Sequence, residues 1–363
     1  MTEALSWRDA LERATGDQAT VGDAALLLRE APLFDLGRAA DDVRRRLHPD
    51  GVVTYIVDRN VNYTNVCACR CSFCAFFRAK GDPGAYVLSD AELSRKIEET
   101  LEAGGTQILL QGGLHPEWDL ADALRLTRLV KRYPIRLHGF SPPEIWHFAA
   151  RSGVSVAEAI ARLREAGLDS IPGGGAEILD DSVRGLISPN KIGWRQWAAV
   201  MREAHRQGLP TSATMMFGSV ESPEHVASHL VRIRELQEET GGFTAFIPWV
   251  FQPGNTLLSR DPRFGESRAE GLGHAVGYLR VLAVSRLVLR NVRTIQVSWV
   301  TMGAKIAQVG LFFGGNDYGS TMMEENVVAS TGVAFRMSEE EIAAMIRDAG
   351  FRPRRREEHR CWT

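Results

Sequence analysis

The chain has 363 residues, of which 44% are hydrophobic and 24% are charged, and its formal charge is −2. A globular chain of this length buries roughly 75% of its extended surface, so it needs no disulfides to fold. The near-neutral charge gives no general indication of nucleic acid or an anionic membrane as a partner.

The first fifty residues are amphipathic and predict a helical extension over 1–50. The N-terminal stretch MTEALSWRDALERATG is charged throughout and lacks the apolar core of a signal peptide. The apolar run LRVLAVSRLVL is broken by Arg286 and is shorter than the ~20 residues of a membrane span. We therefore expect a cytoplasmic protein that engages neither a membrane nor nucleic acid.

From Thr54 onward, short apolar runs that end in Gly, Pro or polar residues alternate with stretches of helical period. Strands as uniformly apolar as these are buried on both faces, which is typical of parallel sheets. Eight such units predict a (β/α)₈ barrel over residues 51–335, although periodicity alone leaves an open doubly wound sheet as the alternative. The runs are 55–67, 106–113, 135–140, 170–178, 211–218, 245–253, 294–300 and 311–319.

Three of the helical stretches begin with a Ser-x-x-Glu capping pair, at 89–92, 155–158 and 338–341. The last pair opens the region 336–363, which we expect to form a C-terminal helix and a charged tail that pack on the barrel. The tail, RPRRREEHRCWT, mixes both signs of charge, and this favours a solvated terminus over a patch for RNA.

Four of the five cysteines fall within residues 67–74. Such clustering, without a secretory signal, indicates metal binding in a reducing compartment. Cys67, Cys71 and Cys74 form a C-x₃-C-x₂-C pattern, and three thiolates leave one iron of a four-iron cluster open to an outside ligand. Cys69 leaves another set of three, or a fourth ligand, as alternatives. A structural zinc site is the competing interpretation, but no second cysteine or histidine pair accompanies this loop.

This cysteine loop resembles the signature of radical S-adenosylmethionine (SAM) enzymes, in which an aromatic residue, here Phe73, commonly precedes the last cysteine. The resemblance implies a [4Fe-4S] cluster whose open iron chelates SAM. It also implies that SAM is a consumed cosubstrate and that an external one-electron reductant, of the flavodoxin or ferredoxin type, is a partner. The cofactor then carries the difficult chemistry and the protein positions it.

Further cofactor residues follow from the same resemblance. Gly112 and Gly113 match the glycines whose backbone meets the methionine amine, although Leu114 stands where an acid is common. The segment TMMFGSVE resembles the adenine-contacting element at the fifth strand, which assigns Met216 and Gly218 to the cofactor. Ser141 and Glu177 complete the expected set on other grounds, because they lie at the ends of the third and fourth runs, where function is located in a barrel.

Several segments between residues 50 and 335, among them DRNVNYTNVCACRCSFCAFFR, HGFSPPEIWH, GGFTAFIPWVFQPGNT and GGNDYGSTMMEENVV, are similar to the family of cyclic dehypoxanthinylfutalosine synthases of menaquinone biosynthesis. The resemblance implies cyclisation of dehypoxanthine futalosine, a small molecule. Aminofutalosine synthases and the radical subunits of deazaflavin synthesis are related families and stay alternatives. A zinc-stabilised binding protein is the alternative from another class.

A substrate with a carboxylate, a sugar and an aryl group needs matching side chains. For the carboxylate we expect an arginine, since Arg binds carboxylates in a bidentate manner. For removal of the final proton we expect a histidine or a carboxylate at a strand end. The catalytic candidates are Asp317, His115 and Glu177, with His138 as a further possible base, and the substrate-binding candidates are Arg59, Arg78, Trp299, Asn316, Asp317, Ser320 and Glu324.

Overall fold

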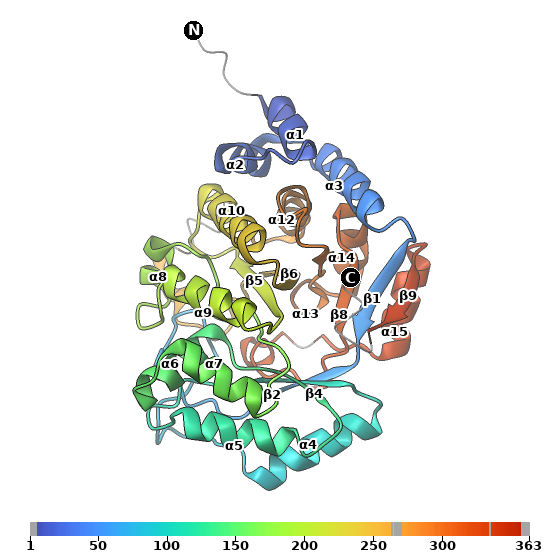
Figure 1. Cartoon of the computed structure of the whole chain (residues 1–363). Helices are drawn as coiled ribbons and strands as arrows, with labels where there is room; N and C mark the ends of the chain where they lie inside the picture. The colour runs from blue at the N-terminus through green and yellow to red at the C-terminus, as the bar shows by residue number, and fades with distance from the viewer. Residues whose placement is uncertain (1–5, 263, 265–270, 334, 357–363) are drawn as a thin grey trace.

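The computed structural model describes residues 6–262, 264, 271–333 and 335–356. Its parallel strands succeed one another around a ring (Figure 1). The first strand is interrupted at Val57 and so is divided into two halves. The strands of the ring are β1 (Val52–Ile56), β2 (Asp58–Asn62), β3 (Gln107–Gln111), β4 (Arg136–Gly139), β5 (Thr211–Phe217), β6 (Phe243–Val250), β7 (Thr294–Ile295) and β8 (Asp317–Ser320).

Single bridges close the ring where the longer ladders stop. Ser170 pairs with His138 and Ile171 pairs with Thr211, so residues 170–171 act as a short strand between β4 and β5. A bridge from Gln296 to Asp317 carries the sheet from β7 to β8, and β8 pairs with β1. Every pairing in this ring is parallel, which confirms the predicted (β/α)₈ barrel and excludes the open sheet.

The helices surround this ring (Figure 1). Those at 90–102 and 339–348 begin with reciprocal Ser-Glu capping boxes, whereas Ser155 only accepts a hydrogen bond from the Glu158 amide. The helices of the barrel and beyond are α4 (Asp90–Glu102), α5 (Leu120–Val130), α6 (Pro142–Ser152), α7 (Val156–Glu165), α8 (Asp181–Ile187), α9 (Trp194–Arg206), α10 (Pro223–Thr240), α12 (Ala275–Val288), α13 (Trp299–Met302), α14 (Ala304–Gly310) and α15 (Glu339–Asp348), with 3₁₀ turns η1 (Leu258–Arg260), η2 (Leu311–Phe313) and η3 (Ala329–Thr331).

The N-terminal region contributes three helices, α1 (Trp7–Thr15), α2 (Val21–Glu30) and α3 (Leu33–Leu47). They pack against α10 and α12 on the outside of the barrel (Figure 1). Among the described residues, no helix combines the length and the apolar character that crossing a bilayer requires.

The region after α15 contains a strand that the sequence pattern did not indicate. Residues 352–355 form β9 (Arg352–Arg355), which pairs in parallel with β1 on the side opposite β8. The first strand thus has different neighbours along its length, because β1 lies between β8 and β9 while β2 pairs with β3. The rest of the tail, 357–363, for which a solvated terminus was predicted, lies outside the described residues.

Candidate active site

The cysteine loop follows β2 and opens into a cavity of about 220 Å³ at the mouth of the barrel. Cys67, Cys71 and Cys74 all line this cavity, which we call the cysteine cavity. Cys69 lines it too, and its thiol donates to the carbonyl oxygen of Asn190 at 3.5 Å. The structure therefore brings the predicted cluster ligands together and also ties Cys69 to the loop that carries Asn190.

Gly112 and Gly113, at the end of β3, have a steric reason to be glycine. A Cβ on Gly113 would lie 2.3 Å from the carbonyl oxygen of Val66 and 2.9 Å from the Cβ of Cys67. A Cβ on Gly112 would lie 2.5 Å from the ring of Tyr63. Since neither position has room for a side chain, the glycines allow β3 to lie directly against the start of the cysteine loop.

Glu144, a residue that the sequence did not single out, braces the same region from α6. Its carboxylate accepts hydrogen bonds from the Tyr63 hydroxyl at 2.7 Å and from the Gly112 amide at 3.0 Å. It also accepts from the amide and the hydroxyl of Ser141, the predicted cofactor residue that caps α6. Burial raises the pKa of Glu144 to about 7, against the opposing effect of these hydrogen bonds.

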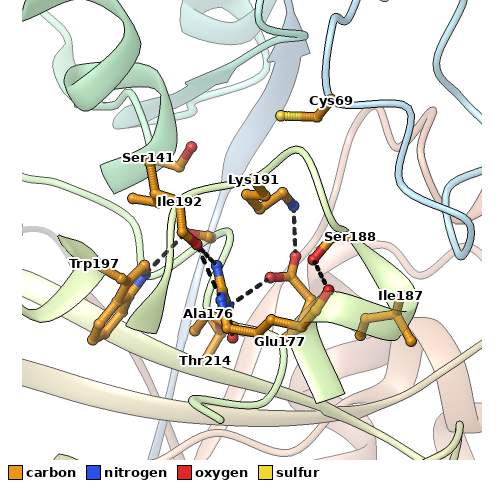
Figure 2. A network of polar contacts seen from close by, with 12 residues as sticks. Cys69, Ser141, Ala176, Glu177, Ile187, Ser188, Lys191, Ile192, Trp197 and Thr214 are labelled. Carbon is orange, nitrogen blue, oxygen red and sulfur yellow. Dashed lines mark hydrogen bonds and ion pairs between the residues drawn. The ribbon is translucent and has the colours of Figure 1, made fainter. Parts of the chain in front are cut away.

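Glu177, which also lines the cysteine cavity, lies in a buried network of charges (Figure 2). Lys191 points at its carboxylate, with Nζ 2.9 Å from Oε1, and Arg184 lies 3.5 Å from Oε2. Lys191 also lies 5.1 Å from the ring centre of Phe73. The backbone of Glu177 has a φ of 40°, a conformation that costs energy for a residue with a side chain and that is common at functional sites.

The Glu177 network carries more positive than negative charge, because one carboxylate faces two cations. Burial alone lowers the pKa of Lys191, but the neighbouring Cys71 and Glu177 raise it above its ordinary value, so the ammonium stays charged. Lys191 lines the cysteine cavity. The network therefore presents a net positive charge to whatever occupies this cavity.

A second cavity of about 310 Å³, the central cavity, occupies the interior of the barrel. On β3 the alternate residues Gln107, Leu109 and Gln111 line it, while Ile108 and Leu110 are fully buried on the opposite face. Barrel interiors of this fold are usually filled with branched apolar side chains. Here many of the inward positions are polar and leave a hollow.

The segment 321–333 crosses the mouth of the barrel after β8. Its residues Met322, Glu325, Val327 and Val328 line the central cavity. Glu324 fastens the segment, since its Oε2 lies 2.7 Å from Nε of Arg59 and 2.6 Å from Nζ of Lys96.

The structure brings some of the predicted substrate residues together and separates others from the cavities. Trp299, Ser320 and His138 line the central cavity, and Glu177 lines both cavities. Arg59 and Glu324 contact each other, and Asn316 accepts a hydrogen bond from the buried Arg286 at 2.6 Å. The candidates outside the walls of both cavities are Arg59, Arg78, His115, Met216, Gly218, Asn316, Asp317 and Glu324.

Several of these separated residues have clear partners elsewhere. Arg78 donates to the carbonyl oxygens of residues 75–77, and His115 packs on Trp118 with a ring-centre distance of 5.5 Å. Met216 is fully buried in the hydrophobic core. Asp317 is fully buried and pairs with Arg356. Sequence periodicity placed His115 and Asp317 at the ends of strands, but Asp317 is the first residue of β8, so it lies at the opposite end of that strand from the one predicted.

The three predicted cluster ligands, Cys67, Cys71 and Cys74, share the wall of the cysteine cavity. A zinc site holds its sulfurs about 2.3 Å from one ion, whereas a cubane spreads its thiolates over separate irons. The Leu114 amide donates to the sulfur of Cys67 at 3.4 Å, a contact of the kind that surrounds iron–sulfur clusters.

Comparison with known proteins agrees with this geometry. Residues 61–233 match the model of the radical SAM superfamily, and residues 240–363 match the CofH/MqnC C-terminal region. The structure is similar to methylornithine synthase, with a TM-score of 0.74, 18% identity and coverage of 98% of this chain and 100% of that one. It is also similar to HydG, a maturase of the [FeFe]-hydrogenase, with a TM-score of 0.73, 15% identity and coverage of 98% and 76%. These two similarities concern the fold alone.

Curated relatives cover nearly the whole chain. The cyclic dehypoxanthine futalosine synthase of Halalkalibacterium halodurans is 43% identical over 95% of this chain and 92% of its own. That of Streptomyces coelicolor is 41% identical over 98% and 88%. The 5-amino-6-(D-ribitylamino)uracil–L-tyrosine 4-hydroxyphenyl transferase of Methanocaldococcus jannaschii is 40% identical over 89% and 91%.

The closed barrel, the cysteine loop and these relatives define a radical SAM enzyme. Within that superfamily, the chain belongs to the CofH/MqnC family. Enzymes of this superfamily use a [4Fe-4S] cluster and SAM, which agrees with the predicted class of cofactor.

Replacing Gly113 by Ala should disturb the cysteine loop, because the added Cβ would overlap Val66 and Cys67. Overpacking of this kind costs about 1–3 kcal/mol, and here the backbone next to a cluster ligand has to shift. We expect the variant to take up less iron and to show weaker visible absorbance after anaerobic reconstitution. Gly185→Ala is the control, since its added Cβ meets no atom within 4 Å. Full iron content in the Gly113→Ala protein would contradict this account.

Glu144 should give the stability of the fold a characteristic pH dependence. Its pKa rises from the ordinary 4.5 to about 7 on folding, so the contribution of its proton to stability is complete below about pH 4.5 and is lost as the pH rises to about 7. The free energy of unfolding of wild type, relative to that of Glu144→Gln, should therefore fall by about 3 kcal/mol between pH 4.5 and 7. Urea unfolding of the cluster-free proteins measures it. If the free energies of unfolding of the two proteins change with pH in parallel, the hydrogen bonds to Glu144 outweigh the effect of burial on its pKa.

Glu324→Gln should loosen the segment 321–333, because it removes the charge that pairs with Arg59 and Lys96. Pairs that are partly shielded from water contribute about 1–2 kcal/mol, which corresponds to roughly five- to thirtyfold faster amide hydrogen exchange in this segment. Glu99→Gln is the matched control, since it removes the other carboxylate partner of Arg59 without touching the segment. Equal exchange in both variants would rule out this fastening role.

Proposed function

We propose that this enzyme cyclises dehypoxanthine futalosine, as the names of its relatives from H. halodurans and S. coelicolor describe. The observation that carries the proposal is that the cysteine cavity and the central cavity adjoin. The two cavities share the wall residues Gln111, Gly174, Gly175, Glu177, Trp249 and Val327. A reactive group generated in one is therefore next to a substrate held in the other.

The residues of the cysteine cavity fit the cofactors of the superfamily. Cys67, Cys71 and Cys74 would hold three irons of a [4Fe-4S] cluster, and Lys191 with Glu177 would hold the charged methionine end of SAM. When bound, the cluster and SAM supply a 5′-deoxyadenosyl radical that accepts a hydrogen atom from the substrate. The positive charge of the Glu177 network suits the SAM carboxylate, and Phe73 covers Lys191 from one side.

In the proposed reaction, the ribose C4′ of the substrate gives up one hydrogen atom and forms a bond to the benzoate ring. The ring then passes one electron to an external one-electron carrier of the flavodoxin or ferredoxin type and gives up one proton to become aromatic again, so the product is two hydrogens lighter. Of the wall residues of the central cavity, Asp58 and His138 can accept that proton. Burial raises the pKa of Asp58, which makes its carboxylate a stronger base.

The aromatic walls of the central cavity suit the aryl group. Trp299 is buried, and its indole N–H donates to the carbonyl oxygen of Ser320 at 3.0 Å, which fixes the ring. Trp249 stands where the two cavities meet. The fixed ring of Trp299 limits the conformations of the cyclohexadienyl radical that follows bond formation.

The second candidate is the hydroxyphenyl transfer of the archaeal relatives, which are 40% and 41% identical to this chain. Because the sequence identity to both groups of relatives is nearly the same, it does not distinguish the two activities. The size of the central cavity favours cyclisation, since about 310 Å³ is at the small end of ligand sites. One compact substrate that carries both reacting groups fits it better than two substrates do. We infer in addition that a flavodoxin- or ferredoxin-type protein supplies the electron.

The test is to incubate the anaerobically reconstituted and reduced enzyme with SAM and dehypoxanthine futalosine. We expect a product two hydrogens lighter, together with methionine and 5′-deoxyadenosine. A parallel reaction with tyrosine and 5-amino-6-(D-ribitylamino)uracil tests the second candidate. Turnover in that reaction alone would replace cyclisation by transfer, and a colourless protein that carries zinc in place of iron and sulfide would end the radical assignment.

A further inference from the structure

The side-chain carboxamide of Gln111 lies where the two cavities meet. Gln111 is the last residue of β3, and it lines both the central cavity and the cysteine cavity. It follows Gln107 and Leu109 along the inward face of that strand. The glycine pair that lies against the start of the cysteine loop comes directly after it. A ligand group held by this carboxamide is therefore next to the site where the proposed reaction begins.

The backbone around Gln111 is fixed on both sides. Its carbonyl oxygen accepts a hydrogen bond from Nδ2 of Asn62 at 3.3 Å, and the next amide, that of Gly112, donates to Glu144 at 3.0 Å. Gly174 leaves room for the side chain, since a Cβ at that position would lie 2.6 Å from Nε2 of Gln111. A polar group on a fixed backbone is in position before its ligand arrives, as a residue that orients a substrate has to be.

The carboxamide of Gln111 is available to a ligand. Of the side chains that line both cavities, those of Gln111 and Glu177 carry oxygen atoms, and the carboxylate of Glu177 is engaged by two cations. Within the part of the chain that the structure describes, no group hydrogen-bonds the carboxamide of Gln111. The carboxamide of Gln107, on the same strand, donates to Asp58 at 2.9 Å. Gln111 can therefore both accept a hydrogen bond from a ligand hydroxyl and donate one to it.

We propose that Gln111 binds the ribose 3′-hydroxyl of the substrate and thereby directs the C4′ hydrogen toward the cysteine cavity. This inference rests on the proposed function, which supplies the substrate and the site of hydrogen abstraction. C3′ is bonded to C4′, so a hydrogen bond to its hydroxyl limits rotation of the sugar at the reacting carbon. Because Glu177 is already paired, and Trp249 and Val327 have no side-chain oxygen, the carboxamide is the acceptor that the described part of the shared wall offers to a hydroxyl.

The test is a cycle of two proteins and two substrates. Wild type and Gln111→Met are each given dehypoxanthine futalosine and its 3′-deoxy analogue, since methionine keeps the length of the side chain and is at most a weak acceptor. Equilibrium binding is measured on anaerobically reconstituted enzyme, and KM, kcat and the ratio of 5′-deoxyadenosine to product are measured in turnover.

Wild type should bind the natural substrate about twofold to tenfold more tightly than the analogue, the range of one neutral hydrogen bond. Gln111→Met should bind both compounds equally, and it should form more 5′-deoxyadenosine per product than wild type does with the natural substrate. The loss from the substitution and the loss from the missing hydroxyl should not add, because both remove the same hydrogen bond.

Two further variants separate this contact from a general effect on the cavity. Gln111→Glu keeps an acceptor on a side chain of the same length and should recover part of the preference for the hydroxyl. Gln107→Met removes the carboxamide that is bonded to Asp58, and it should change the binding of both compounds by the same factor. Iron content is measured for every variant.

The inference is overturned if wild type binds and converts the two substrates equally, a result that needs no variant. It is also overturned if the two losses add in a Gln111→Met protein with a normal iron content. If Gln111→Met raises the KM for SAM and keeps the preference for the hydroxyl, the carboxamide serves the cofactor and the inference is wrong. If wild type neither binds nor converts dehypoxanthine futalosine, the proposed function fails, and the inference falls with it.

Discussion

The interruption of the first strand at Val57 is the constraint on which the site depends. A straight strand would pair with the same neighbours along its whole length. Here β1 pairs with β8 and β9, while β2 pairs with β3. The second half leads into the cysteine loop at the mouth, and the first half leaves an edge that β9 fills, which brings Arg356 to the wall of the central cavity. One break therefore brings both the cysteine loop and the C-terminal strand to the cavities of the barrel.

The site also shows how a barrel can carry charges inside. The buried charged groups lie in sets whose members compensate one another, such as Glu177 with Lys191 and Arg184, or Asp317 with Arg356. A buried charge without such a partner would cost several kcal/mol. Pairing leaves each set rigid, and rigidity is what positions a cofactor and a substrate for a radical reaction, in which loose contacts lead to side products.

Much of this could be predicted from the sequence, and the failures have physical reasons. Apolar runs, capping pairs and the cysteine spacing are local signals, and they gave the barrel and the loop, including the short strand at 170–171. Lys191 and Glu144 were missed because single charged residues in loops or helices carry no pattern. β9 was missed because a strand of arginines pairs through its backbone and lacks apolar alternation. Arg59 and Glu324 were expected to face the substrate, but they pair with each other. They lie 265 positions apart in the chain, and no local pattern shows such a contact.

The central cavity has a consequence for how long the protein lasts in a cell. Side chains that line a ligand cavity have fewer protein atoms beside them than side chains in a packed interior, so they make fewer dispersion contacts within the chain. A ligand that fills the cavity supplies those contacts, and anything that binds only the folded chain shifts the equilibrium away from unfolding. The substrate thus serves as a removable part of the core. In a cell, proteases act on the unfolded fraction, so the lifetime of such an enzyme follows the supply of its own metabolite.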